Sequence, residues 1–124
     1  MDTSIKVLIV DDFATMRRIL KNILKQIGFK NLLEADDGTT ALEVLDRESV
    51  DLIISDWNMP KMTGLELLKS VRASDKFKRT PFLMVTAEAQ KQNVIEAVQA
   101  GVSNYVVKPF TAEAISEKLE KILK

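Results

Sequence analysis

Five polar side chains stand where short apolar runs of this chain end, and together they could hold a cation and accept a phosphoryl group. They are Asp11, Asp12, Asp56, Thr86 and Lys108. Carboxylates that crowd together need a cation, and a hard divalent ion with oxygen ligands is the natural one. A hydroxyl and an ammonium add two groups that can bond an oxyanion. The set therefore predicts a Mg²⁺ site at which a carboxylate could take up a phosphoryl group.

The apolar runs that end at these residues are typical of buried strands. Each run is short and rich in Val, Ile or Leu, as expected in a parallel sheet that is covered on both faces. In an open α/β sheet, ligands bind just beyond the carboxyl ends of the strands. The five side chains should therefore meet at one edge. The four runs cover residues 5–10, 52–55, 82–85 and 105–107.

Helical periodicity alternates with these runs. From residue 13 to 27, apolar residues recur at spacings of three and four, which predicts a helix with one buried stripe, and Gly28 ends it. A weak additional strand is expected at 31–35. Strict alternation of strand and helix predicts an α/β fold, a parallel sheet with right-handed crossovers and helices on both faces. The stripe consists of Met16, Ile19, Leu20, Ile23, Leu24 and Ile27. The later helices are expected to begin at Gly38, at Gly64, near residue 91 and after the capping residue Thr111.

The length of 124 residues predicts one domain over residues 1–124. Hydrophobic residues make up 46% of the chain and charged residues 29%, which is ordinary for a globular protein. Eighteen basic and eighteen acidic residues cancel, so neither nucleic acid nor a membrane is expected as a partner. The absence of Cys fits a cytoplasmic location. We also expect the chain to be a monomer.

The chain also contains no His. Zinc sites of the His/Cys type and a Ser-His-Asp triad are therefore excluded. A phosphohistidine on this chain is excluded too, so a phosphoryl group that reaches Asp56 by that route must come from another molecule.

Four of the five residues have an ordinary structural interpretation as well. Asp11 or Asp12 could cap the helix that follows, since Asp is a favoured N-cap residue. Thr86 alone is uninformative, and Lys108 alone is typical of a solvated lysine. Directly before Pro109, however, Lys108 is restricted to extended backbone conformations. Their joint placement at strand ends is what favours a functional site.

Longer motifs run along the chain: VDDFATMRR at 10–18, SDWNMP at 55–60, GLELLK at 64–69, LMVTAEA at 83–89 and AGVSNYVVKPF at 100–110. Together they resemble response-regulator receiver domains, and specifically the single-domain regulators of chemotaxis. The resemblance covers essentially the whole chain. It implies a flavodoxin-like (βα)5 fold, with a doubly wound five-stranded parallel sheet of order 2-1-3-4-5. Thr63 departs from the pattern, since such domains often carry Asp or another polar residue there, and we expect it to tune function rather than abolish it.

The resemblance also implies a role for each polar residue. Asp56 would be the phosphoacceptor for a chemotaxis histidine kinase, in a self-catalysed signalling step rather than an enzyme's turnover. Thr86 and Lys108 would bond the phosphoryl group, and the Lys108–Pro109 bond would be cis. The Mg²⁺ ligands would be Asp11 through water, Asp12, Asp56 and the main-chain carbonyl of Asn58.

The output would be a conformational change read by other proteins. Asn58 and Glu88 would tune loss of the phosphoryl group by self-catalysed dephosphorylation. When phosphorylated, the chain would bind the flagellar motor switch and change rotation, with a phosphatase as a further candidate partner. The expected switch and partner face consists of Tyr105, Ala89, Lys91, Val94, Val98 and Lys118.

Three other classes remain open from the residues alone. A phosphatase of the haloacid-dehalogenase type also uses a strand-end Asp with Mg²⁺, but it would want an acid where this chain has Asn58. A flavodoxin-like FMN binder would need a phosphate-cradling loop where Asp11 and Asp12 would repel phosphate. A degenerate receiver would bind partners without phosphorylation, which the presence of Asp56, Thr86 and Lys108 disfavours.

Overall fold

The computed structural model of the protein describes residues 1–87 and 91–123. Strands and helices alternate along the chain, as the sequence predicts. The elements are β1 (Lys6–Val10), α1 (Ala14–Ile27), β2 (Asn31–Ala35), α2 (Gly38–Arg47), β3 (Leu52–Asp56), α3 (Gly64–Ala73), β4 (Phe82–Thr86), α4 (Lys91–Gln99), β5 (Asn104–Val107) and α5 (Ala112–Ile122).

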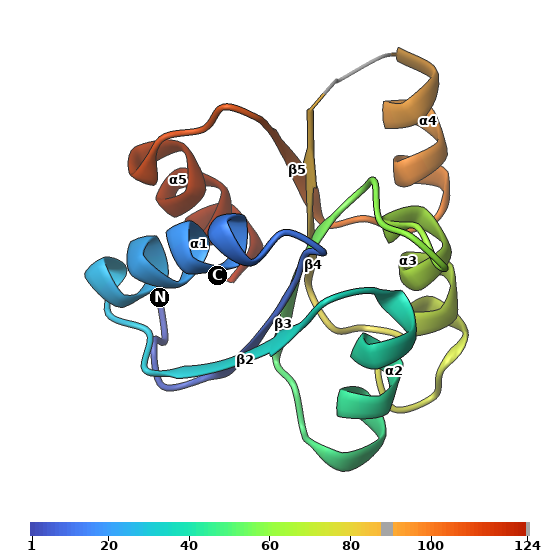
Figure 1. The fold of residues 1–124 in the computed structure, drawn as a ribbon, viewed down its shortest axis with the longest axis horizontal. Coiled ribbons are helices and arrows are strands. Elements are labelled where there is room, and N and C mark those ends of the chain that lie inside the picture. The colour runs from blue at the N-terminus through green and yellow to red at the C-terminus, as the bar shows by residue number, and fades with distance from the viewer. Residues whose placement is uncertain (88–90, 124) are drawn as a thin grey trace.

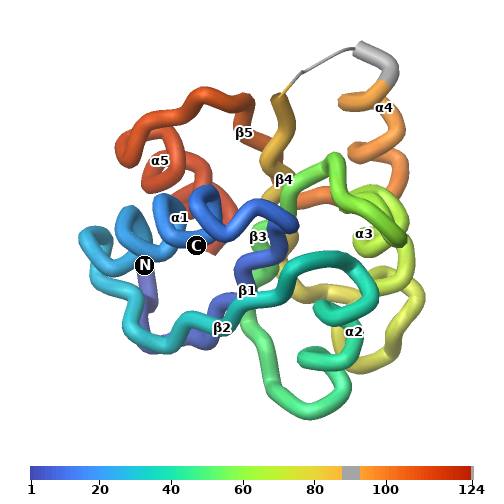
Figure 2. Tube along the Cα trace, viewed as in Figure 1, coloured from blue at the N-terminus to red at the C-terminus, as the bar shows by residue number. Residues whose placement is uncertain are grey.

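The five strands form one parallel sheet in the order β2-β1-β3-β4-β5. Helices α1 and α5 cover one face of the sheet, and α2, α3 and α4 cover the other (Figure 1). The trace in Figure 2 shows the two ends of the chain on the side of α1 and α5. The predicted fold class and strand order are confirmed.

The sheet is buried on both faces because each strand supplies side chains to two cores. On β1, Leu8 and Val10 belong to the core under α2 and α3, whereas Val7 and Ile9 belong to the core under α1 and α5. Strands β3 and β4 are buried throughout. Two-sided burial explains why these strands appear in the sequence as continuous apolar runs.

The register aligns the carboxyl ends of the strands. Val10 pairs with Ser55, Asp56 pairs with Val85, and Thr86 pairs with Val107. The residues that follow β1, end β3 and β4, and follow β5 therefore share one edge.

Helix α1 differs from its prediction at two residues. It begins at Ala14, and Phe13 is its N-cap residue with 64% of its surface exposed. Ile19 was expected in the buried stripe but is 42% exposed. Leu20 and Leu24 face the sheet, and Ile19 points roughly 100° away from Leu20 because that is the rotation per helical residue. Periodicity thus locates the stripe but overestimates its width.

Helix ends follow the predicted local chemistry. Gly28 ends α1 with φ of 125°, which is in the left-handed region that glycine adopts readily. The Thr111 hydroxyl accepts a hydrogen bond from the Ala114 N–H at 3.0 Å and so caps α5. The Lys108–Pro109 bond is cis, as predicted.

Within residues 1–87 and 91–123, no helix has the length and apolar character needed to cross a bilayer.

Candidate functional site

Three carboxylates meet at the carboxyl edge of the sheet. Asp11 and Asp12 follow β1, and Asp56 ends β3. Each offers one oxygen, and these oxygens lie within 4.8 Å of one another. Asp11 and Asp56 are buried, with 1% and 6% of their surfaces exposed, whereas Asp12 is exposed. The structure therefore brings together the acidic residues that the strand pattern places at this edge.

Lys108 reaches the same cluster from the end of β5. Its Nζ lies 3.1 Å from Asp56 Oδ1 and 3.7 Å from Asp11 Oδ2. The backbone N–H of Lys108 donates to the Thr86 carbonyl at 2.7 Å, which continues the β4–β5 pairing to this point. Among the described residues, Lys108 alone forms ion pairs with this cluster of three carboxylates, so the cluster keeps an excess of negative charge.

The Asp11 carboxylate is only half satisfied. Its Oδ1 accepts a hydrogen bond from the Phe13 N–H at 2.9 Å. Its Oδ2 is buried without a hydrogen-bond partner, because the 3.7 Å to Lys108 is an ion-pair distance beyond hydrogen-bond range. Burial raises the pKa of Asp11 above its ordinary value, and the Phe13 N–H offsets this only in part. A buried oxygen with no hydrogen-bond donor, in an anionic cluster, has the chemistry of a cation ligand.

The interpretation of the acidic pair as a helix cap is wrong. The N-cap position of α1 belongs to Phe13, and no side chain there accepts a capping hydrogen bond. Asp11 instead stabilises the turn before the helix, because its Oδ1 accepts the hydrogen bond from the Phe13 N–H.

Burial dominates the protonation of Asp56 as well. It raises the pKa of this carboxyl, and the hydrogen bond and charge of Lys108 lower it again without cancelling the effect. Both buried carboxylates therefore hold a proton more readily than ordinary carboxyls do. A cation in the cluster would favour their ionised forms.

The loop between β3 and α3 is held tightly against Asp56. The Gly64 N–H donates to the Trp57 carbonyl at 2.8 Å, and a Cβ added at Gly64 would collide with the Asp56 carbonyl oxygen. Glycine is therefore required for this close approach. This packing positions Asn58, which is exposed on the same loop.

Thr63 has a structural role that the sequence analysis missed. Its hydroxyl accepts from the Glu66 N–H at 3.2 Å, and the Glu66 carboxylate accepts from the Thr63 N–H at 3.0 Å. These reciprocal bonds form a capping box at the start of α3. A Thr followed three residues later by Glu, before an apolar run, is the sequence signal that predicts it.

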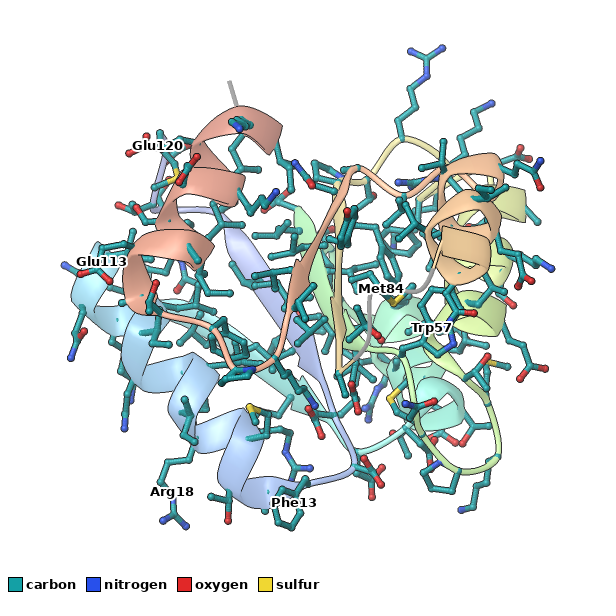
Figure 3. All side chains as sticks on the ribbon, turned by 90° about the horizontal axis from the view of Figure 1, so that it is seen from above. Phe13, Arg18, Trp57, Met84, Glu113 and Glu120 are labelled. Atoms are coloured by element: carbon teal, nitrogen blue, oxygen red, sulfur yellow. The ribbon has the colours of Figure 1, made fainter. Side chains whose placement is uncertain are left out.

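Behind the acidic cluster, Thr86 and Tyr105 share a small cavity of about 10 Å³. Thr86 is buried at 6% exposure, and Tyr105 is half-buried with the Lys118 ammonium 5.6 Å from its ring centre. Figure 3 shows Trp57 and Met84 side by side below α4. The cavity is lined by Trp57, Met84, Thr86, Asn93, Val94, Ala97 and Tyr105.

The predicted partner face is partly exposed and apolar. On α4, Val98 is 61% exposed, Val94 is half-buried and Ala97 is buried. Ile95 belongs to the same apolar arc of α4 and is exposed, and Val107 on β5 adds exposed apolar surface beside it. Three predicted positions lie outside what the structure describes. They are residues Glu88 and Ala89 and the side chain of Lys91.

Comparisons with known proteins agree with this architecture. The model of the response regulator receiver domain family matches residues 7–120. The chemotaxis protein CheY of Pseudomonas aeruginosa is 61% identical over 117 residues, which are 94% of this chain and 94% of that protein. Chemotaxis protein CheY-3 of Vibrio cholerae is 55% identical over 98% of this chain and 94% of that protein. The structure of CheY4 from Vibrio cholerae superposes with a TM-score of 0.89 at 38% identity, covering 97% of this chain and 99% of that one.

Proposed function

The chain belongs to the response regulator receiver domain family, as a chemotaxis regulator of the CheY type, and we propose that it accepts a phosphoryl group on Asp56 from a histidine kinase. One observation carries the proposal: the Lys108 ammonium lies 3.1 Å from Asp56 Oδ1 within an acidic cluster. Family membership also favours this function over a haloacid-dehalogenase phosphatase and over an FMN binder.

The reaction is a nucleophilic displacement at phosphorus. An oxygen of the ionised Asp56 carboxylate attacks the phosphorus of a phosphohistidine on the kinase. A P–O bond forms, the P–N bond breaks, and its electron pair returns to the imidazole of the kinase. Lys108 favours the ionised form of Asp56 before the transfer and stabilises the phosphoryl oxygens after it. The Thr86 hydroxyl donates to a phosphoryl oxygen once that group is present.

The residues at this edge fit Mg²⁺. The Asp11 oxygen without a hydrogen bond and the negative charge of the cluster are the observations that support a cation here. Asp12, Asp56 and the main-chain carbonyl of Asn58 would hold it directly, and Asp11 would hold it through water. When bound, Mg²⁺ supplies positive charge that offsets repulsion between the carboxylates and the incoming phosphoryl oxygens.

The output follows from the packing around Thr86. When its hydroxyl moves toward the phosphoryl group, the cavity that it shares with Tyr105 enlarges and the tyrosine ring turns inward. This motion biases a two-state equilibrium of the surface formed by α4, β5 and α5. Complete switching from 1:99 to 99:1 requires about 5.5 kcal/mol of differential stabilisation.

The phosphorylated surface binds the flagellar motor switch and so changes rotation. Exposed Val98 and half-buried Val94 supply apolar contact area, and Lys91 and Lys118 meet acidic residues of the partner. Asn58 and Glu88 control how fast water removes the phosphoryl group, and a separate phosphatase could accelerate that loss.

Transfer from a purified chemotaxis histidine kinase tests the proposal. A kinase that carries a labelled phosphoryl group should lose it to the wild-type chain in the presence of Mg²⁺ and keep it in the presence of Asp56→Asn. A degenerate receiver would leave the label on the kinase in both cases. Binding of a motor-switch peptide should then be tighter with beryllofluoride than without it, because a ligand that binds both states equally shifts neither.

A further inference from the structure

The Arg17 side chain extends from the first turn of α1 back to the turn after β1 that carries Asp11 and Asp12. Its Nη1 donates to the carbonyl oxygen of Asp11 at 2.6 Å, and its Nε donates to Glu34 Oε1 on β2 at 3.1 Å. The side chain is 19% exposed. One guanidinium therefore ties the turn that carries the acidic residues to the neighbouring strand.

Glu34 is a firm anchor for this guanidinium. It lies beside Ile9 in the β1–β2 register, and its second oxygen accepts from Lys21 Nζ at 3.0 Å. Burial tends to raise the pKa of Glu34, but the hydrogen bonds from Lys21 and Arg17 outweigh it, so the pKa lies below its ordinary value. The carboxylate is thus ionised at neutral pH and holds the Nε side of Arg17 in place.

The carbonyl that Arg17 binds belongs to the peptide group joining Asp11 to Asp12. The Asp11 N–H is already fixed by the Ala35 carbonyl at 3.1 Å, and Asp11 Oδ1 accepts from the Phe13 N–H. Asp12, by contrast, is exposed, and one of its oxygens lies within 4.8 Å of oxygens of Asp11 and Asp56. The direction of the Asp12 side chain depends on the plane of the peptide that Arg17 holds.

We propose that Arg17 is a positioning residue for the cation site: by binding the Asp11 carbonyl while Glu34 holds it, Arg17 sets the orientation of the Asp12 carboxylate toward the cation. The proposal rests on the function proposed above, because it assumes that the acidic cluster binds Mg²⁺. A partly exposed ion pair on its own contributes little to stability. Groups that orient metal ligands, in contrast, typically change metal affinity by about 10–100-fold when they are removed.

The test compares Arg17→Ala with Lys21→Ala by calorimetric titration of Mg²⁺ into the full chain. Both variants remove one cation from Glu34, but only the first releases the Asp11 carbonyl. Arg17→Ala should weaken Mg²⁺ binding about tenfold, and Lys21→Ala should stay within about twofold of the wild type. Arg17→Lys, which keeps the charge but loses the two-donor fork, should fall between them. It also serves if the alanine variant does not fold.

A second readout needs no metal. Because the Phe13 amide donates to Asp11 Oδ1, its hydrogen exchange reports whether the turn is held. Exchange should be several-fold faster in Arg17→Ala than in Lys21→Ala. Equal Mg²⁺ affinity and equal Phe13 exchange in the two variants would overturn the positioning role, as would Arg17→Lys binding Mg²⁺ like the wild type. If the wild type binds no Mg²⁺, both the proposed cation site and the role of Arg17 toward it are overturned. If the wild type binds Mg²⁺ and Arg17→Ala binds it equally well, only the positioning role is overturned.

Discussion

Replacing Lys108 by Met removes the only basic group that forms an ion pair with the acidic cluster among the described residues, while keeping a long apolar stem. At neutral pH and without metal, two buried carboxylates then lose the ammonium that lies 3.1 Å from Asp56 and 3.7 Å from Asp11. The variant should be destabilised, because an uncompensated buried charge costs more than an exposed one.

The distances bound the size of the effect. Coulomb's law at 3.1 Å gives about 5 kcal/mol for an effective dielectric constant of 20 and about 1.3 kcal/mol for bulk water. The Lys108 side chain is 23% exposed, which places it between these limits, and its removal also relieves the cost of burying it. We therefore expect a loss of about 2 kcal/mol in the free energy of unfolding. For a chain of this size that lowers Tm by roughly 5–10 °C.

Urea unfolding with EDTA, across a range of pH, measures this loss. The interaction with Lys108 requires ionised carboxylates, so the loss should be complete only where Asp56 and Asp11 are ionised in the variant as well as in the wild type, and it should vanish as both carboxyls become protonated at acid pH. Because Lys108 lowers the pKa of Asp56, its removal moves the upper end of this range to higher pH. Lys121→Met is the matched control, since its ion pair with Glu117 is also 3.7 Å long but exposed, and it should change stability by less than about 0.5 kcal/mol. In an Asp56→Asn background the cost of Lys108→Met should shrink. A loss that is the same at acid and neutral pH would mean that Lys108 acts through packing, and it would refute this electrostatic account.

Other expected outcomes test the metal site, the loop between β3 and α3, and the two residues proposed to control loss of the phosphoryl group. Mg²⁺ at about 100 times its Kd should stabilise the folded wild type by about 2.7 kcal/mol and perturb Trp57 fluorescence. Asp12→Ala should abolish both responses, and a wild type whose stability and fluorescence do not change in millimolar Mg²⁺ would contradict the cation site. Gly64→Ala should lower the free energy of unfolding by about 1–3 kcal/mol, because its Cβ would collide with the Asp56 carbonyl, and a urea midpoint equal to that of the wild type would show that the loop can yield. Substitution of Asn58 or Glu88 should change the rate at which the phosphoryl group is lost, followed by the decay of labelled protein, without preventing its gain, and the opposite pattern would reverse their roles.

The strand-end residues were predictable because three rules act together. Apolar runs rich in Val and Ile locate the strands, strict alternation with helices makes the sheet parallel, and parallel strands place their carboxyl ends at one edge. Asp56 and Lys108 are 52 positions apart in the sequence, yet these rules bring them within 3.1 Å. The capping box of Thr63 and Glu66 was equally accessible from its four-residue pattern.

Other features depend on three-dimensional paths that no local pattern encodes. The contact of Arg17 with the Asp11 carbonyl depends on how α1 enters from β1, and its contact with Glu34 depends on which strand lies beside β1. The need for Gly64 arises only because the loop after β3 folds back onto the Asp56 carbonyl. Figure 3 shows Phe13 pointing outward at the start of α1, although an apolar residue there suggests burial.

The central claim is that Asp56 receives the phosphoryl group, and intact-protein mass spectrometry after incubation with acetyl phosphate and Mg²⁺ tests it most directly. The wild-type chain should gain one phosphoryl group, and peptide mapping after borohydride reduction should locate it at Asp56. Asp56→Asn should gain none while keeping the circular dichroism spectrum of the wild type, because the amide preserves shape but removes the nucleophile. A wild type that stays unmodified, or an Asp56→Asn variant modified as fully as the wild type, would contradict the assignment.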